Sequence, residues 1–476
     1  MSFVMKWAMC RKWQYDVTGR PTHHRISSQN RNTRRRAYNW DVNHRLRSMV
    51  NELTGVKVTY GYDEFSNLVW SNQGGQFDFL HRSVDDVGNL YETKEKTDRV
   101  YGAGSRLLET REAIFSYDEE GNLVQKVEKN GSTWKYEYNG NGMMAKVIRP
   151  DETEVTFKYD SLGRRIEKSS NEKIMKFVWD GNTILHEYLL KGNSDKSENL
   201  VESSSKNKSE VPDNLVTWVF NDGFVPSAKI TNEGNYSIIS DYLGTPVEAF
   251  DEEGNKVWSA ELDIYGRVIE FTGEPGEQDF IPFRYQGQCH DIETGLYYNR
   301  FRYYDPERGN YTQIDPIGLA GGNPTLYGYV ANPNISIDPF GLIVVFRNIR
   351  PDEDIAKGLS ARIPGRNMTP HGHVAKGSSH KGSQFISTTT DIEVANSWRE
   401  SGQRTVMFDT DDVIPDAVGD RKILDISTHE KARANGIGDV TANFSASSKE
   451  VLVVGHVPSN KLSYVNEKGV ICKKRG

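Results

Sequence analysis

A chain of 476 residues and 54.0 kDa is too long for one ordinary hydrophobic core, so we expect two or more domains. Hydrophobic residues make up only 36%, but 11% aromatics and 23 tyrosines argue against disorder and favour a folded, β-rich chain with much polar surface. The net charge is -7, and residues 343–476 hold 19 Lys and Arg against 16 Asp and Glu, so they carry +3 and the rest carries -10. This asymmetry permits an anionic target for the C-terminal part without requiring one.

No apolar run reaches the roughly 18 residues that a membrane-spanning helix needs. The opening, MSFVMKWAMCRKW, has too short an apolar run and no cleavage pattern for a secretory signal. We therefore expect a protein made in the cytoplasm that reaches other cells by a different route. Cys10, Cys289 and Cys472 are odd in number and lack CxxC spacing, so we expect incidental thiols and no metal site.

From the N-terminus a short motif recurs in which an aromatic or apolar residue precedes Asp and a turn ending in Gly and Asn or Arg. The copies are centred on Asp16, Asp41, Asp63, Asp85, Asp118, Asn139, Asp160 and Asp180. Their spacings of 25, 22, 22, 33, 21, 21 and 20 residues are typical of stacked units that contact their neighbours. Alternating segments such as TWKYEY predict strands, while the aspartate and glycine suit tight turns. Two strands per unit predict a long, curling sheet.

Residues 193–213 are Ser, Lys, Glu and Asn with almost nothing apolar, which predicts a solvated loop inserted between strands. The repeats then resume in degenerate form, as in DYLGTPVEAFDEEGNKVW and LDIYGRV.

The repeated motif resembles the YD repeats of Rhs proteins and of the C subunits of insecticidal toxin complexes. The resemblance implies that residues 1–282 form a β shell, or cocoon, so the fold class is mainly β. Eight clear copies are fewer than a closed shell of that family uses. This favours the C-terminal part of a shell that another Rhs shell fragment completes.

Residues 283–342 differ in composition from the repeats and contain the motifs FRYYDPERGNYTQIDPIGL and NISIDPFGL. This segment resembles the Rhs-associated core, which plugs the shell and cuts itself just after the final DPxGL. The resemblance implies that Asp315 and Asp338 form the cleaving pair and that the bond between Leu342 and Ile343 is cut. Two neighbouring carboxylates can share a proton, so that one acts as base and the other as acid.

The last segment, residues 343–476, predicts a small α+β domain. A strand, IVVFRNIR, carries Arg347 and is followed by a loop with His371, His373 and His380. The strand QFISTTT leads into an amphipathic helix, DIEVANSWRES, with Asp391 as its N-cap. After QRTVMFD comes the segment SSKEVLVVGHVP, in which Glu450 leads directly into an apolar strand.

These strands resemble the Arg, Ser-Thr-Ser and Glu pattern of ADP-ribosyltransferase toxins of the cholera and heat-labile enterotoxin type. The resemblance implies that Arg347 holds the phosphates of NAD and that Ser387, Thr388 and Thr389 brace the nicotinamide pocket. Glu450 would be the catalytic acid, without a metal. NAD is then a substrate, and breaking its bond to nicotinamide passes through an oxocarbenium-like state that one carboxylate can stabilise.

Two positions depart from that pattern. Ile349 stands where the family often has aspartate, and Ser448 stands where a Glu or Gln helps to select the acceptor. An acceptor other than arginine is therefore expected, on a target protein or an RNA in the recipient cell.

Two other functions are compatible with the sequence. The loop HGHVAKGSSHKGS would serve a nuclease in which His371 and His373 do acid-base work on a phosphodiester. A non-enzymatic surface or adhesion protein is the second alternative, which the DPxGL boundary argues against. For the favoured toxin we expect a cognate immunity protein and a delivery apparatus, such as type VI secretion, as further partners.

Overall fold

The computed structural model describes most of the chain. The described residues are 9–75, 78–171, 173–190, 212, 214–221, 223–273, 278–315, 325–339, 341, 344–351, 353–361, 363, 368–376, 384–389, 392–400, 403–409, 422–425, 432–433, 437–448, 450–459 and 462–465. The chain forms two compact units, one of Met1–Ile314 with Tyr327–Pro339 and the other of Asp315–Leu326 with Phe340–Gly476. Among the described residues, every helix is too short or too polar to cross a bilayer.

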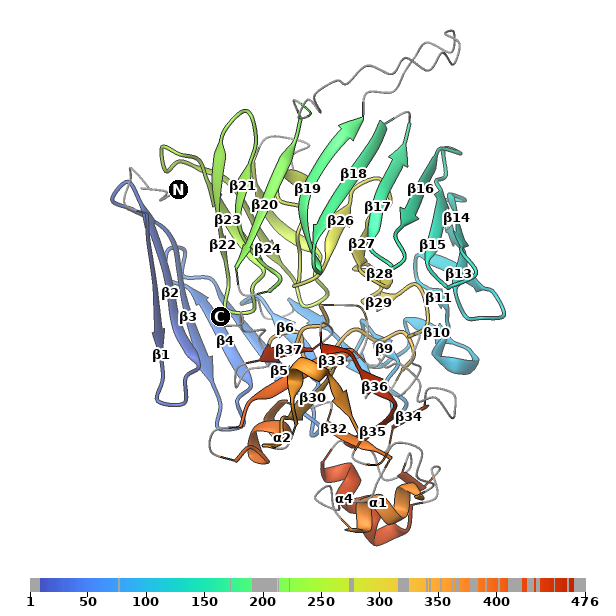
Figure 1. The fold of residues 1–476 in the computed structure, drawn as a ribbon. Coiled ribbons are helices and arrows are strands. Elements are labelled where there is room, and N and C mark those ends of the chain that lie inside the picture. Colours follow the sequence, from blue (N-terminus) through green and yellow to red (C-terminus); the bar gives the residue numbers. More distant parts are fainter. Residues whose placement is uncertain are drawn as a thin grey trace, which may run out of the picture. The chain divides into compact units, whose positions relative to one another are not determined.

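The first unit is built from antiparallel strands that pair in chain order, so each sheet is a meander (Figure 1). The seven-stranded sheet consists of β1 (Cys10–Tyr15), β2 (Pro21–Ser28), β3 (Arg31–Trp40), β4 (Leu46–Asn51), β5 (Lys57–Tyr62), β6 (Leu68–Asn72) and β7 (Phe79–His81). The sixteen-stranded sheet consists of β10 (Arg99–Tyr101), β11 (Leu107–Thr110), β12 (Ala113–Tyr117), β13 (Leu123–Glu128), β14 (Thr133–Tyr138), β15 (Met144–Ile148), β16 (Glu154–Tyr159), β17 (Arg165–Ser170), β18 (Lys173–Asp180), β19 (Thr183–Leu190), β20 (Val216–Asn221), β21 (Val225–Ile230), β22 (Asn235–Ser240), β23 (Pro246–Phe250), β24 (Lys256–Leu262) and β25 (Val268–Thr272). Strands β8 (Ser83–Val84) and β9 (Leu90–Tyr91) form a separate pair.

In most of the described repeats the aspartate carboxylate closes the turn that follows it. In the turn at Asp160, one carboxylate oxygen accepts the amides of Leu162 and Arg164, both at 2.9 Å, and the other accepts Arg164 Nε at 2.7 Å. Gly163 supplies the positive φ of +72° that the turn requires. In the same way, the carboxylate accepts the amide and the side chain of the residue four positions later at Asp16, Asp41, Asp63, Asp85, Asp118, Asp251 and Asp263. That fourth residue is always Arg or Asn, which explains the end of the motif.

The aromatic residue before the aspartate bonds to the preceding repeat. Tyr138 Oη donates to the carbonyl of Leu123 at 2.9 Å, and Tyr159 Oη donates to that of Met144 at 2.7 Å. The acceptor is the fifth residue after the preceding Asp or Asn. Equivalent bonds run from Trp40 to Pro21, from Tyr62 to Leu46 and from Trp179 to Arg165. The YD pair therefore closes one turn and ties it to its neighbour.

The two large sheets also contact each other within this unit. Thr33 on β3 donates to the Glu248 carboxylate on β23 at 3.0 Å, and Arg36 pairs with Glu261 on β24 at 2.6 Å. Gln29 donates to the carbonyl of Glu253 at 2.8 Å. Strands that are more than 200 residues apart in the sequence thus lie side by side.

A four-stranded sheet packs against the sixteen-stranded sheet, which we call the wall. It consists of β26 (Cys289–Asp291), β27 (Leu296–Asn299), β28 (Arg302–Asp305) and β29 (Asn310–Tyr311). Its Asp291 forms a buried ion pair with Arg165 of the wall, whose guanidinium also stacks on the Tyr298 ring at 4.3 Å. A buried charge is tolerated only when it is paired in this way.

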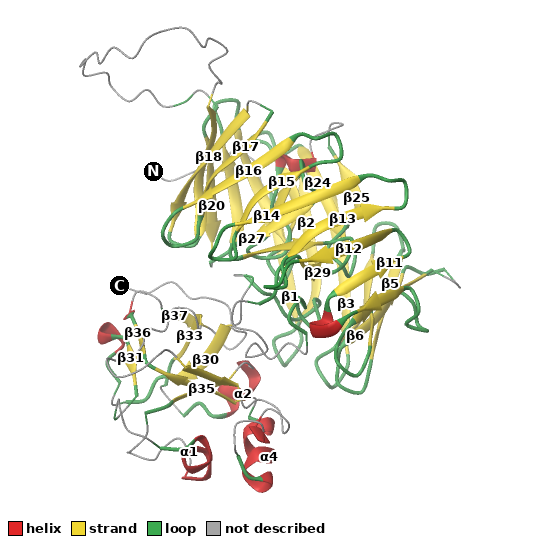
Figure 2. Cartoon of the chain, turned by 90° about the vertical axis from the view of Figure 1, so that its right-hand side faces the viewer, coloured by secondary structure: helices red, strands yellow, loops and turns green. Residues whose placement is uncertain are grey.

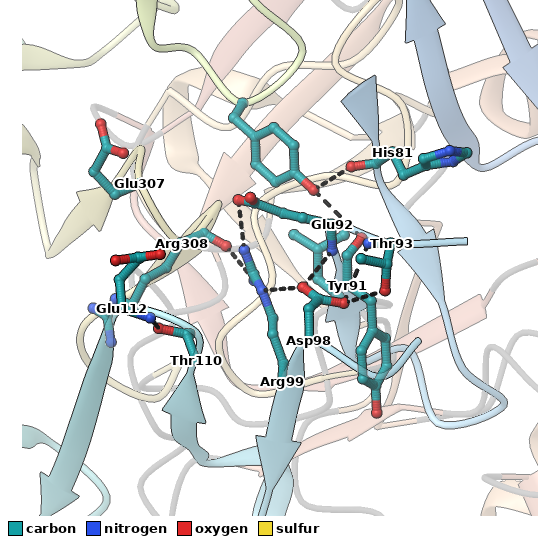
Figure 3. A network of polar contacts seen from close by, with 12 residues as sticks. His81, Tyr91, Glu92, Thr93, Asp98, Arg99, Thr110, Glu112, Glu307 and Arg308 are labelled. Carbon is teal, nitrogen blue, oxygen red and sulfur yellow. Dashed lines mark hydrogen bonds and ion pairs between the residues drawn. The ribbon is translucent and has the colours of Figure 1, made fainter. Parts of the chain in front are cut away.

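A second polar contact joins this sheet to the start of the sixteen-stranded sheet. Arg99 on β10 donates to the carbonyl of Arg308 at 2.6 Å and pairs with Glu92 at 2.9 Å (Figure 3). Nearby, Tyr265 Oη donates to the carbonyl of His81 at 2.6 Å. Arg99 thus joins the start of the sixteen-stranded sheet to the four-stranded sheet, while Tyr265 joins the turn after β24 to the end of β7.

The second unit has a six-stranded sheet in the order β34-β35-β32-β30-β33-β37. Its strands are β30 (Val344–Asn348), β32 (Ile386–Thr389), β33 (Thr405–Asp409), β34 (Lys422–Asp425), β35 (Glu450–Val454) and β37 (Ser463–Val465), beside the pair β31 (Leu359–Ser360) and β36 (His456–Val457). The described α-helices belong to this unit and are α1 (Pro370–Lys376), α2 (Ile392–Ser397) and α4 (Asp439–Ser447), as labelled in Figure 2, which also draws the short 3-10 helices of the other unit in red.

Strand alternation gives this sheet two apolar faces. Val451 and Val453 pack with Ile386 and Phe408 on one face, while Leu452 packs with Phe385 on the other.

The prediction of a mainly β chain with a repeat shell is confirmed. The predicted loop at 193–213 lies outside the described residues apart from residue 212, as do Asp391, His380 and Cys472. Cys10 and Cys289 are free thiols, the second of them buried.

Replacing Tyr138 with Phe removes the phenol that bonds to Leu123 and leaves that carbonyl without its partner. We expect the shell unit to lose about 1–2 kcal/mol of unfolding free energy. Urea denaturation followed by tryptophan fluorescence reports on this unit, because eight of the 9 tryptophans precede residue 259. Tyr188→Phe, at a half-buried tyrosine of β19, is the matched control and should change the midpoint little. Equal losses in both variants would contradict the role given to the aromatic residue.

Candidate active site

The central strands of the second unit bring together the residues that the sequence singled out. Arg347 lies on β30, Ser387 on β32 and Glu450 at the start of β35, and these strands are neighbours in the sheet. In the strand register Phe346 is opposite Thr389, which in turn is opposite Glu450. Segments separated by 40 and 63 residues therefore converge on one stretch of sheet.

Glu450 is a buried carboxyl group. Only 8% of the residue is exposed, and the described part of this unit offers it a side-chain hydrogen bond from Ser387. Desolvation raises the pKa of Glu450 to about 7, against the smaller lowering effect of the Ser387 bond. A carboxyl group with its pKa near neutrality is typical of functional sites, although buried structural acids share this property.

Arg347 is fixed by two contacts. Its Nη1 donates to the carbonyl of Ser387 at 2.6 Å, and its Nη2 pairs with Glu353 Oε1 at 2.8 Å. Glu353 also pairs with the Arg350 guanidinium at 2.9 Å and accepts the Arg350 amide at 2.8 Å. Both Arg347 and Glu353 are largely buried, so their charges are neutralised at close range.

A histidine completes the cluster. His373 on α1 is 2% exposed, and a hydrogen bond of 2.7 Å joins its Nε2 to Ser387 Oγ. Its ring packs edge-on against Phe385 at 5.3 Å between centroids. His371, by contrast, accepts the amide of Gly438 through Nδ1 at 3.1 Å. Ser387 is thus the common neighbour of Arg347, His373 and Glu450.

The two threonines of the Ser-Thr-Thr segment tie strands together. Thr388 Oγ1 donates to the carbonyl of Val451 at 2.7 Å, and Thr389 Oγ1 donates to that of Ser448 at 2.8 Å. The Ser448 hydroxyl donates to the carbonyl of Phe444, at the end of α4. Thr388 and Thr389 therefore hold β32 against the β35 segment, which keeps Ser387 and Glu450 together.

Two residues of this cluster escaped the sequence reasoning. Glu353 supplies the carboxylate that pairs with Arg347. The family motif would place such a carboxylate at position 349, but Ile349 packs there at the edge of the apolar core. The acidic run DED at 352–354 was the available signal. For His373 it is the placement and role that were missed: the sequence predicts a loop histidine that would serve a nuclease with His371, whereas the structure has His373 on helix α1 beside Ser387.

The two aspartates predicted to cleave the chain, Asp315 and Asp338, belong to different units. Asp338 is buried, and its carboxylate accepts Tyr311 Oη at 2.7 Å and faces Arg302 Nη2 at 3.4 Å. Asp315 is also buried, and its amide donates to the carbonyl of Leu326 at 2.8 Å within the other unit. Leu342 and Ile343 lie outside the described residues. The pairing of Asp315 with Asp338 and the cleavage site remain predictions.

The raised pKa of Glu450 predicts how the stability of its unit varies with pH. Since the folded pKa of about 7 exceeds the ordinary 4.5, the protonated form favours folding, and this contribution is lost as the pH rises from about 4.5 through 7. Glu450→Gln should therefore match the parent at pH 4 and exceed it by up to about 3 kcal/mol above pH 7. Hydrogen exchange at β32 and β35, compared between variants at each pH, measures this difference. Glu400→Gln, at an exposed glutamate, is the control and should not show the trend.

Three curated relatives illustrate what the chain is similar to. Double-stranded DNA deaminase toxin A from Burkholderia cenocepacia is 31% identical over 323 residues, which are 64% of this chain and 22% of that protein. Toxin protein Tse5 from Pseudomonas aeruginosa is 33% identical over 266 residues, or 51% of this chain and 20% of that protein. Probable deoxyribonuclease RhsA from Dickeya dadantii is 31% identical over 250 residues, or 50% and 16%. The chain spans about a fifth of the length of these relatives.

The repeats themselves match a family model. The model of the teneurin YD-shell covers residues 5–318, which takes in the two large sheets, the four-stranded sheet and the first of the two predicted cleaving aspartates. The match ends before the sheet that holds Arg347, Ser387 and Glu450. From its repeats, its sheets and this match, the chain belongs to the teneurin YD-shell family.

Proposed function

We propose that this chain is part of a toxin whose shell carries a C-terminal ADP-ribosyltransferase, residues 343–476, that acts on a macromolecule of a recipient cell. The observation that carries the proposal is the convergence of Arg347, Ser387 and a buried Glu450 on three adjacent strands. The names of three relatives, two of them toxins and one a probable deoxyribonuclease, support the general toxin role and leave the reaction open.

In the proposed reaction NAD is the substrate. The Glu450 carboxylate accepts a hydrogen bond from a ribose hydroxyl and stabilises the positive charge that develops as the bond to nicotinamide breaks. Nicotinamide leaves with the bonding electrons, the acceptor group attacks the exposed ribose carbon, and the acceptor's proton is lost to a base. Arg347 binds the phosphates, for which its guanidinium must exchange Glu353 for the dinucleotide.

The transferase is favoured over the nuclease by the surroundings of the histidines. The nuclease needs both histidines at its substrate, whereas His373 is buried and bonded to Ser387, which leaves the exposed His371 as the reachable member of the pair. His373 is better suited to holding Ser387 in place beside Glu450. The target, a protein or an RNA, and a cognate immunity protein remain expectations of this proposal.

We further propose that the plug releases this cargo by cutting the bond between Leu342 and Ile343. Asp315 and Asp338 act as the pair, one taking a proton from water and the other giving one to the leaving amine. Both carboxylates are buried, which suits groups whose ionisation must be controlled by neighbours.

Glu450→Gln tests the transferase. We expect the variant chain to transfer label from labelled NAD to cell lysate at least about 100-fold more slowly than the parent, because the group that stabilises the transition state has lost its charge. Scintillation counting of protein and RNA fractions measures the transfer and identifies the acceptor class. The exposed Glu400→Gln is the matched control and should label like the parent. Equal labelling by the Glu450 variant would rule the transferase out.

Asp338→Asn tests the release step. We expect the parent chain to separate into two fragments and the variant to stay intact, because an amide cannot take the proton from water. Denaturing electrophoresis and the mass of the small fragment measure the cut and its position. Asp251→Asn, in an exposed repeat turn, is the control and should cut normally. A variant at Asp338 that still splits would remove the dyad from consideration.

A further inference from the structure

The Asp338 carboxylate lies in a polar network inside the plug. Tyr311 Oη donates to its Oδ2 at 2.7 Å, and Arg302 Nη2 lies 3.4 Å from the same oxygen. Asp338 is 7% exposed and Tyr311 is fully buried. The Arg302 guanidinium also stacks on the Tyr311 ring, 3.7 Å from its centroid. The phenol is therefore held between a cation and a carboxylate.

The backbone around Asp338 is clamped by the same part of the plug. Asn299 Nδ2 donates to the carbonyl of Asp338 at 2.8 Å and to Tyr311 Oη at 2.6 Å. The Asp338 amide donates to Tyr329 Oη at 3.3 Å. Gly287 approaches so closely that a Cβ there would lie 2.0 Å from the carbonyl oxygen of Pro339. Asp338 and Pro339 are thus fixed as a unit, four residues ahead of the proposed cleavage site.

We propose that Tyr311 is a positioning residue for self-cleavage, which orients the Asp338 carboxylate and keeps it ionised so that Asp338 is the base of the pair. This inference rests on the proposed release step. A carboxylate that accepts a hydroxyl hydrogen bond and faces a guanidinium is favoured in its charged form. Of the two aspartates, the charged one must take the proton from water, so Asp315 is left as the acid.

The step then balances in atoms and electrons. A water proton passes to Asp338 while the water oxygen attacks the carbonyl carbon of Leu342. The bond from that carbon to the nitrogen of Ile343 breaks, the electron pair stays on nitrogen, and Asp315 supplies the proton of the leaving amine. One water is consumed, one carboxylic acid and one amine form, and a proton returns from Asp338 to Asp315 through solvent.

Tyr311 is suited to this role because its own proton stays in place. Desolvation, and after it the charge of Asp338, raises the pKa of Tyr311 well above its usual value. The phenol therefore keeps its proton at neutral pH and can donate to Asp338. The charged or titratable groups that the structure describes against Asp338 are Arg302 and Tyr311, with Tyr329 nearby.

The test is the rate of self-cleavage of the full chain after cell-free synthesis, followed over time at several pH values. We expect Tyr311→Phe to cut at least about tenfold more slowly near neutral pH, since a hydrogen bond to a charged group is lost. The acid limb of its rate profile should also move to higher pH, because Asp338 without its donor ionises less readily. The parent and Asp338→Asn are run beside it.

Tyr304→Phe is the matched control. Tyr304 belongs to the same buried tyrosine cluster, and its Oη donates at 2.7 Å to the carbonyl of Tyr265 and not to Asp338. It should lose a comparable hydrogen bond without shifting the pH profile. Melting curves of both variants check that they fold alike.

The outcomes separate the two proposals. A parent that cuts, Asp338→Asn that does not, and Tyr311→Phe that cuts like the parent would overturn the role of Tyr311 alone. A Tyr311→Phe chain that is slow but keeps the parent's pH profile, or is matched by Tyr304→Phe, would assign Tyr311 a structural role and overturn the inference too. A parent that never cuts would overturn the release step and this inference with it.

Discussion

The shell depends on one recurring hydrogen-bond pattern. An aspartate carboxylate closes a turn by accepting hydrogen bonds from the amide and the side chain of the residue four positions later, as Asp160 does with Arg164. The aromatic ring before it bonds to the carbonyl that follows the previous turn, as Tyr159 does with Met144. Each pair therefore satisfies polar groups in two adjacent repeats. Where this pattern occurs, the turn is fixed locally and tied to the adjacent repeat, which favours a single register of the sixteen-stranded sheet.

Charges neutralised at short range occur at Asp291 and in both proposed sites. Asp291 of the plug is held by Arg165 of the wall, Asp338 lies against Arg302, and Arg347 is paired with Glu353. Glu450 differs, because its described neighbour is a hydroxyl group and its pKa rises to about 7. Among the described residues this buried carboxyl group has a hydroxyl partner and no ion pair, an arrangement that is costly to stability and that favours a chemical role.

Much of this architecture is visible in the sequence, because turns and strand alternation are local. The period, the Asp turns and the three strands of Arg347, Ser387 and Glu450 follow from short motifs. The contacts between distant segments do not. Neither the donation of Tyr311 to Asp338 nor the pairing of Glu353 with Arg347 has a spacing rule, since each depends on how loops pack in three dimensions. The lack of a carboxylate at position 349 therefore did not mean that Arg347 lacks one, because Glu353, six residues from the arginine, reaches the same guanidinium.

The bonds from each aromatic residue to the preceding repeat have an evolutionary consequence. Tyr138 bonds to Leu123 and Tyr159 to Met144, so the turn and its tie to the neighbouring repeat are completed within two adjacent repeats. Gain or loss of a whole repeat would preserve these local bonds, whereas contacts such as that of Arg165 with Asp291 restrict where a repeat can be exchanged. Repeats without such remote contacts are therefore the places at which the gene for such a sheet could lengthen or shorten, in steps of about 21 residues.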